Sequence, residues 1–349
     1  MGPLLVRRMV SYVGSVEGVF REKRHTLQKI PGIGIIKSSR FDRDKALRTA
    51  EKELEYIRKH EITVLFYLDE EYPNRLRECE DGPLVIFFKG EVNFNAAKVL
   101  SFVGTRKASV RGRQVTEEMI AYLGENYPDI LIISGLAYGI DICAHKKALD
   151  CKLRTIAALG HGFEYMYPAA HRRQAAQIAR QGALVTEFLS CRKPDPGNFV
   201  SRNRIIAGLA DATIIIESAV KGGALITADL ANSYNRDVFA VPGRVTDTFS
   251  KGCNQLIRLN KAALAESGKD IEAAMGWIKR KKNTQRTISF DLNPEEKSVL
   301  TYLDEKGPAA IDLISLGLNI PVPALSALLL NMEFRGLVKS LPGKYYQRI

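Results

Sequence analysis

Apolar runs that alternate with helical segments between residues 97 and 265 constrain the fold of this chain more than any other feature. Each run is apolar throughout, which is typical of strands in a parallel sheet that helices cover on both faces. Such strands are joined by right-handed crossovers, so the pattern predicts an α/β fold with a doubly wound, Rossmann-like parallel sheet. The expected strands are Val99–Val103, Ile130–Ile133, Thr155–Leu159, Ala183–Thr186, Thr213–Ile216 and Val238–Val241.

The length of 349 residues predicts smaller domains beside this one. Residues 1–60 are expected to form a small helical domain, in which Ile30-Pro31-Gly32-Ile33-Gly34 separates two helices. This arrangement is typical of a helix-hairpin-helix module, which holds phosphates through backbone N–H groups; an ordinary turn between helices is the alternative. Met1-Gly2-Pro3 is similar to the middle of another such hairpin, so we expect a truncated N-terminal domain.

The rest of the chain divides into three parts. Residues 61–275 are assigned to an extended Rossmann-like domain, and residues 276–290 to a basic linker that contains Lys279-Arg280-Lys281-Lys282. Residues 291–349 are expected to form three helices and a hairpin, the elements of a winged helix. Its presumed recognition helix, residues 323–335, carries only one cation, so we expect it to contact protein, or DNA only weakly.

Charge and composition narrow the classes of partner. The net charge of +12 favours polyanions, and the excess lies outside residues 291–349, which hold seven acidic and six basic side chains. No apolar run reaches the roughly 18 residues that span a membrane, and the N-terminus lacks a secretory pattern, so the expected location is the cytoplasm. Five cysteines without a C-x-x-C pair argue against a disulfide framework or a metal site.

The segments that directly follow the strands are the predicted ligand site, because open parallel sheets bind ligands beyond the carboxyl ends of their strands. Glycines there let the backbone approach a phosphate, and arginine binds phosphate through two parallel hydrogen bonds. No G-x-G-x-x-G motif follows the first strand, so a dinucleotide cofactor is not expected, and turns without any ligand are the alternative. The candidates are Gly104, Thr105, Arg106, Ser134, Gly135, Lys221, Gly222, Gly223, Arg244 and Lys251.

The segment Asn198–Arg204 adds an aromatic ring and two more cations to these candidates. Proteins that hold single-stranded nucleic acid combine aromatic rings that stack on bases with cations along the backbone. Phe199, Arg202, Asn203 and Arg204 fit this pattern. The alternative is a core phenylalanine with arginines on a solvated helix face.

We expect no catalytic site. Asp141 and His145 lie four residues apart on one helix and Ser134 precedes them, but no strained nucleophile turn of the G-x-S-x-G type is present. The chain is therefore predicted to be a binding protein rather than an enzyme, without a cofactor.

Five ordered motifs resemble those of the DNA-processing protein A (DprA/Smf) family: Val103–Arg106, Ser134–Asp141 with Ala144-His145, Asn198-Phe199 with Arg202–Ile206, Gly222–Ala228 and Ala240–Gly243. The resemblance implies an extended Rossmann fold, single-stranded DNA in a basic pocket, and homodimers. It also implies cooperation with single-strand-binding protein and the loading of RecA in natural transformation and recombination. The family's pocket arginine falls on Arg106 and its stacking phenylalanine on Phe199, while Leu256, Ile257, Leu259 and Leu264 are a candidate dimer face.

Two other functions compete with this one. Hydrolases of the lysine-decarboxylase-like group have a similar nucleotide-binding Rossmann-like domain with a P-G-G-x-G-T-x-x-E pattern. Here Lys221 replaces the proline and Thr227 is followed by Ala228-Asp229-Leu230, so the glutamate is missing. A regulator that binds duplex DNA through the winged helix is the third possibility, and the acidic balance of residues 291–349 counts against it.

Overall fold

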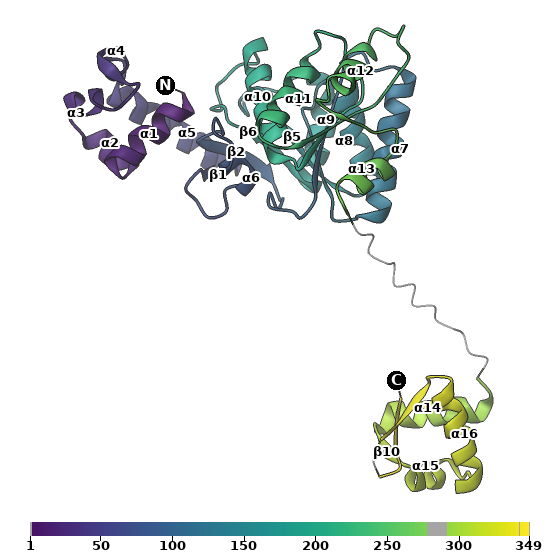
Figure 1. The fold of residues 1–349 in the computed structure, drawn as a ribbon. Helices are drawn as coiled ribbons and strands as arrows, with labels where there is room; N and C mark the ends of the chain where they lie inside the picture. Colours follow the sequence, from purple (N-terminus) through teal and green to yellow (C-terminus); the bar gives the residue numbers. More distant parts are fainter. Residues whose placement is uncertain (1, 278–291, 342, 349) are drawn as a thin grey trace. The chain divides into compact units, whose positions relative to one another are not determined.

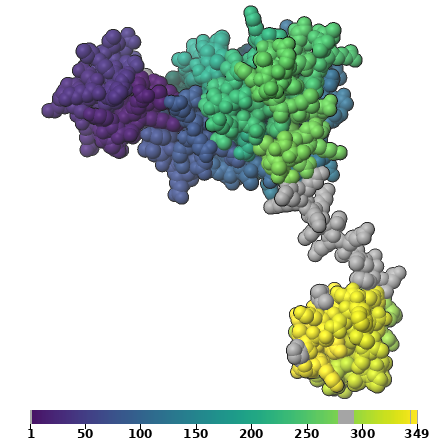
Figure 2. All heavy atoms as spheres, viewed as in Figure 1, coloured from purple at the N-terminus to yellow at the C-terminus, as the bar shows by residue number. Residues whose placement is uncertain are grey.

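The computed structural model describes residues 2–277, 292–341 and 343–348. The chain forms two compact units, Met1–Arg280 and Lys281–Ile349, which are drawn as ribbons in Figure 1 and with all heavy atoms in Figure 2. The predicted linker cluster, residues 279–282, lies outside the described residues. No single helix in the described ranges is long and apolar enough to cross a membrane; only two helices of the second unit pass that test, jointly and with a bend of 111° between them.

A nine-stranded sheet forms the centre of the first unit, in the order β1-β2-β6-β5-β4-β3-β7-β8-β9. The strands from β3 to β9 pair in parallel, which confirms the doubly wound Rossmann-like sheet. All six predicted strands are present, with bounds shifted by at most one residue. They are β3 (Val99–Val103), β4 (Leu131–Ser134), β5 (Arg154–Ala158), β6 (Ala183–Thr186), β7 (Ala212–Ile215) and β8 (Asp237–Ala240).

Alternate residues of each strand pack on opposite faces of this sheet. Val99 and Val103 of β3 belong to the cluster that includes α10 (Pro196–Leu209) and α11 (Gly223–Ser233). Leu100 and Phe102 belong to the cluster that includes α7 (Val110–Asn126), α8 (Ile140–Asp150) and α13 (Gly268–Ala274). The fully apolar strand sequences follow from this arrangement, since neither face is left to solvent.

Two further strands extend the sheet at its β6 edge. The strand-like runs noted before residue 97 form β1 (Thr63–Phe66) and β2 (Val85–Gly90), and the short helix α6 (Asn74–Arg77) lies between them. Both strands pair antiparallel, β1 with β2 and β2 with β6. At the opposite edge α12 (Lys251–Arg258) leads to the short strand β9 (Ala263–Leu264).

The N-terminal residues form the helices α1 (Pro3–Val13), α2 (Val16–Arg21), α3 (Arg24–Gln28), α4 (Gly34–Ser39) and α5 (Arg43–His60). The predicted break lies between α3 and α4, with Gly32 and Gly34 at φ values of 87° and 57°. The carboxylate of Glu53, on α5, joins this part to the sheet domain by accepting hydrogen bonds from the backbone N–H (2.8 Å) and the hydroxyl (2.9 Å) of Ser190.

The second unit has the elements of a winged helix: α14 (Pro294–Lys306), α15 (Ile311–Leu318), α16 (Val322–Phe334) and a sheet of β10 (Ala309–Ala310), β12 (Tyr345–Arg348) and β11 (Val338–Leu341). Its core includes Val299, Leu303, Ile314 and Leu329. The presumed recognition helix α16 exposes large apolar side chains, Leu330 (53%) and Phe334 (83%). This surface fits the prediction that the winged helix is a poor major-groove binder, because that groove is contacted through hydrogen-bonding side chains.

Candidate nucleic-acid interface

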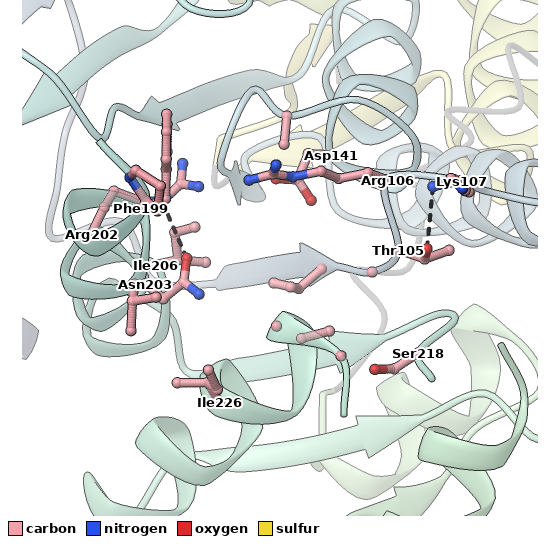
Figure 3. A pocket seen from close by; sticks show the side chains of 18 of the residues that line it. Thr105, Arg106, Lys107, Asp141, Phe199, Arg202, Asn203, Ile206, Ser218 and Ile226 are labelled. Carbon is pink, nitrogen blue, oxygen red and sulfur yellow. Dashed lines mark hydrogen bonds between the residues drawn. The ribbon is translucent and has the colours of Figure 1, made fainter. Parts of the chain in front are cut away.

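A cavity of about 730 Å³ lies at the carboxyl ends of the central strands, where the sequence predicted the ligand site. Its walls come from the segment after β3, the start of α8, one face of α10 and the start of α11 (Figure 3). The α10 residues Phe199, Arg202, Asn203 and Ile206 face it because the spacing i, i+3, i+4, i+7 places them on one side of a helix. The turns at this edge therefore enclose a space rather than only connecting strands to helices.

Arg106 is a cation of this cavity that is free to bind an anion. Its side chain is exposed, and no described residue forms a hydrogen bond or ion pair with it. Its guanidinium carbon lies 5.7 Å from the centre of the Phe199 ring, so the predicted arginine and phenylalanine lie side by side. A guanidinium without a protein partner keeps its hydrogen-bond donors for a phosphate.

The first turn of α11 supplies backbone donors to the same cavity. Gly222, Gly223 and Ala224 line it, and no side chain caps this helix. A Cβ atom built on Gly223 meets nothing within 4 Å, so the space in front of the helix is open. Unsatisfied N–H groups and the helix dipole make such a terminus a binding site for anions.

The first turn of α7 faces the same edge of the sheet but is not open. Ser109 caps the helix, and its backbone N–H donates to a carboxylate oxygen of Glu217 at 2.9 Å. The Ser109 hydroxyl donates to the other oxygen of that carboxylate. Glu217 thus occupies the place that an anion would take, so of these two helices only α11 offers its first turn to a ligand.

The structure corrects the role predicted for Arg202. This residue is only 3% exposed, and its guanidinium donates at 2.6 Å to the carbonyl oxygens of Gly135 and of Ala158. Burial lowers the pKa of Arg202 to about 10, against the opposing effect of the Asp141 carboxylate. Arg202 therefore stabilises the floor of the cavity instead of contacting phosphate directly.

Asp141 and Ser134 belong to the same floor. Asp141 lines the cavity but is only 6% exposed, and burial raises its pKa although Arg202 acts in the opposite direction. The Ser134 hydroxyl donates to the Phe102 carbonyl at 2.7 Å, and the residue is fully buried. The structure therefore does not place Ser134 in direct contact with a ligand, in contrast to the prediction. Gly135 contributes its carbonyl to Arg202, which leaves no room for a side chain at this position.

Arg204, which was also predicted to contact DNA, lies outside the cavity. It forms an ion pair with Glu187, in which the two side chains are 12% and 13% exposed, and it does not line the cavity. Burial raises the pKa of Glu187, while Arg204 lowers it. The guanidinium is thus engaged within the protein.

The other predicted residues divide between the cavity and its surroundings. Gly104, Thr105 and Asn203 line the cavity, and Asn203 accepts a hydrogen bond from Nε of Arg202 at 3.2 Å. Arg244 lies in a neighbouring cavity of about 700 Å³ that shares Phe249 with the first. Lys221 and Lys251 are exposed outside the first cavity, Lys251 beside a third one.

Sequence reasoning missed Tyr167 and Lys107, which both line the cavity. The Tyr167 ring is 41% exposed, and its centre lies 5.3 Å from that of Phe199 at an angle of 44°. Its backbone N–H donates to Nε2 of His161 at 3.2 Å. The aromatic–proline pair Tyr167-Pro168, in the connection after β5, was the available signal.

Asp141 and His145, which lie four residues apart on one helix, do not both line the cavity. His145 is fully buried, its Nδ1 lies 2.8 Å from the Thr155 hydroxyl, and burial lowers its pKa to about 3. Among the described residues, no group of three or more His, Cys, Asp or Glu side chains is placed to hold a metal ion.

Known protein families match both parts of this chain. The family model described as DNA recombination-mediator protein A matches residues 63–276, and the model described as DprA winged helix domain matches residues 284–344. Protein Smf of Synechocystis sp. is 30% identical over 100% of this chain and 96% of its own length.

Two solved structures are also similar. The X-ray structure of DNA processing protein A from Streptococcus pneumoniae is 32% identical, with a TM-score of 0.65 over 77% of this chain and 92% of that one. The Helicobacter pylori protein of the same name, for which a single-stranded DNA binding mode is described, is 25% identical, with a TM-score of 0.55 over 61% and 95% of the two chains.

Proposed function

The chain belongs to the DNA recombination-mediator protein A (DprA/Smf) family, and from this premise we propose that it binds single-stranded DNA and acts in DNA recombination. One observation carries the proposal: an unpaired arginine, an aromatic ring and an open helix N-terminus line the same cavity. These are Arg106, Phe199 and the first turn of α11. The description of the Helicobacter pylori relative supports the choice of ligand.

Each group has a separate task in this proposal. Arg106 binds one phosphate through two parallel hydrogen bonds, and the N–H groups of Gly223 and Ala224 bind another. An aromatic ring stacks on a base irrespective of its identity, which contributes roughly 1–3 kcal/mol per base. Single strands are favoured because the bases of a duplex are already stacked and paired, and cannot enter the cavity.

We further propose that the protein works as a homodimer that loads RecA, with displacement of single-strand-binding protein, in the cytoplasm. Family membership supports this extension. Of the predicted dimer face, Leu256 is 4% exposed and belongs to the core, while Leu259 and Leu264 are 52% and 49% exposed and stay candidates. Two linked cavities would raise the affinity for a long strand through effective concentration. Sedimentation of Leu259→Glu against wild type tests the dimer, and RecA filament assembly on coated DNA tests the loading.

We also propose that the protein has no hydrolase activity. Asp229 of α11 is the carboxylate closest in sequence to the position of the missing glutamate. It forms a 2.8 Å ion pair with Lys261 and does not line the cavity. This position of Asp229 outside the cavity supports the proposal. Release of products from adenosine monophosphate by the pure protein, lost in Asp141→Asn, would favour the hydrolase instead.

The proposed binding is tested by fluorescence anisotropy with single- and double-stranded oligonucleotides across a salt series. Arg106→Ala should weaken single-strand binding about 10–150-fold, since a charged hydrogen bond contributes about 1.5–3 kcal/mol. It should also reduce the slope of log K against log salt by about 0.7, the value for one phosphate contact of a single strand.

Arg180→Ala is the matched control. Arg180 is likewise an exposed arginine, near the end of α9 (Arg172–Gln181). That end leads into the amino end of β6, whereas the cavity lies at the carboxyl ends of the strands. Arg180→Ala removes the same charge and should change neither affinity nor slope. Equal binding of both duplex and single strand, unaffected by Arg106→Ala, would overturn the proposal.

A further inference from the structure

Two exposed tyrosines, one that lines the cavity and one that lies beside it, have no part in the function proposed so far. Tyr167, in the connection after β5, is 41% exposed, and Tyr138, in the turn between β4 and α8, is 46% exposed. No described residue forms a hydrogen bond with either hydroxyl. Each ring therefore keeps exposed aromatic surface and a free hydroxyl that a ligand can contact.

Phe199 offers less free ring surface than these tyrosines. It is half-buried, with the guanidinium carbons of Arg106 and Arg202 5.7 Å and 6.0 Å from the ring centre. A Cβ atom at Gly160 would lie 2.5 Å from its Cδ1, so the ring also packs on that glycine.

The three rings belong to one continuous surface. Phe199 and Tyr167 have centres 5.3 Å apart. Tyr138, Tyr167 and Phe199 line a common gap together with Arg106, and this gap of about 10 Å³ is too small to admit a base. Bases would therefore lie on the outer faces of the rings, not between them.

The surroundings of Tyr138 fix its ring and continue the surface toward further cations. The ring packs against that of His171 at 4.8 Å and 66°, and Nδ1 of His171 lies 2.7 Å from the Leu136 carbonyl oxygen. Arg172 and Arg173 follow His171 directly and are exposed. Aromatic rings next to cations are the combination that holds the bases and the backbone of a single strand.

We propose that Tyr167 and Tyr138 extend the base-stacking surface beyond Phe199, so that successive bases of one strand lie on the three rings and its backbone continues toward Arg172 and Arg173. This inference rests on the proposed binding of single-stranded DNA and assigns the direction in which the strand leaves the cavity. The cavity and this ring surface together form a longer site than the cavity alone.

The test uses the full chain and the shortest thymidine oligonucleotide that binds with full affinity, together with versions that lack one base at each position in turn. Tyr167→Ala and Tyr138→Ala should each weaken binding about 5–150-fold, which corresponds to the contribution of one stacked base. The phenylalanine variants at both positions should bind within about 3-fold of wild type, because the ring is kept.

The abasic oligonucleotides separate stacking from a structural role. For wild type, one abasic position should reproduce the loss of Tyr167→Ala, and the variant should lose nothing more at that position. The salt slope should stay unchanged in both tyrosine variants, whereas Arg106→Ala should reduce it. Equal losses for every abasic position in variant and wild type would show a structural role and overturn the inference.

The outcomes also distinguish this inference from the proposed function. If Arg106→Ala weakens single-strand binding but Tyr167→Ala and Tyr138→Ala do not, the inferred stacking on the tyrosines is overturned and the proposed function is left intact. Absence of single-strand binding by wild type would overturn both.

Discussion

Replacement of Arg202 by methionine is the change that most directly tests the corrected role of this arginine. Methionine keeps much of the volume of the side chain but removes the charge and both hydrogen bonds to the Gly135 and Ala158 carbonyls. Asp141 then loses the cation that opposes the effect of burial on its pKa. A direct phosphate contact at Arg202 would predict a change in DNA affinity without a change in stability.

The expected loss of stability is large because every affected group is buried. A buried acceptor without a donor costs about 1–3 kcal/mol, and the carbonyls of Gly135 and Ala158 both lose their donor, while Asp141 loses the nearby positive charge. These costs overlap at one site, so we expect about 3–5 kcal/mol in total. With a slope near ~3 kcal/mol per molar urea, the unfolding midpoint should fall by about 1–1.7 M.

The loss should also depend on pH. The pKa of Asp141 is raised in the folded state, so the folded state binds more protons than the unfolded state above the ordinary pKa of this carboxyl, and stability falls as pH rises through the folded value. Without Arg202 that pKa rises further. Arg202→Met should therefore lose more stability at pH 8 than at pH 5.

Trp277 makes the measurement specific for the sheet domain. It is the only tryptophan of the chain, and its ring packs against Tyr127 at 5.2 Å within the first unit. Its fluorescence during urea unfolding thus reports on that unit alone. The double variant Arg202→Met with Asp141→Asn should recover part of the lost stability and should lack the added pH dependence. A double variant no more stable than Arg202→Met would refute the inferred electrostatic effect of Arg202 on Asp141.

Three further predictions follow from the positions of single groups. Gly223→Asp should weaken single-strand binding at least about 5-fold, through ~1 kcal/mol of repulsion between the new carboxylate and a phosphate. The same carboxylate at the helix N-terminus should stabilise α11 by about 0.3–1 kcal/mol. Affinity measured by anisotropy should therefore fall while the urea midpoint rises, and a lower midpoint with unchanged affinity would contradict the open terminus. Arg204→Gln should lower stability by about 3 kcal/mol and leave single-strand affinity within about 3-fold, and a parallel loss of affinity would restore its predicted DNA contact. The fragment 292–348 should not bind duplex DNA tightly at physiological salt, because α16 exposes Leu330 and Phe334, and tight binding in an anisotropy titration would show that another surface contacts DNA.

The sheet was predictable because its sequence signal is physical and redundant. Strands buried on both faces must be apolar throughout, and each of the six predicted runs carried that signal by itself. The β1–β2 addition was not predictable from the same pattern. Its two runs were visible, but pairing with β6 in the antiparallel direction depends on contacts between residues far apart, such as Gly90 opposite Ala183.

The site was only partly predictable because residue type does not reveal direction. Arg202 and Arg204 lie two residues apart on α10, which places them about 200° apart around the helix axis. Arg202 points to the cavity side and is consumed by backbone carbonyls, whereas Arg204 points toward Glu187. The place of Arg106 could be predicted without knowing an orientation around a helix axis. This residue lies in the turn directly after β3, where any side chain is close to the carboxyl ends of the strands.

The carboxylate of Glu217 at the first turn of α7 has a consequence for ligand size. A compact nucleotide whose phosphates approached the first turn of α7 would meet a fixed negative charge that the protein itself supplies. A polymer avoids this repulsion, because its phosphates are spread along the chain and can follow Arg106 and α11 instead. We therefore expect the Glu217 carboxylate to weaken the binding of compact nucleotides beside α7.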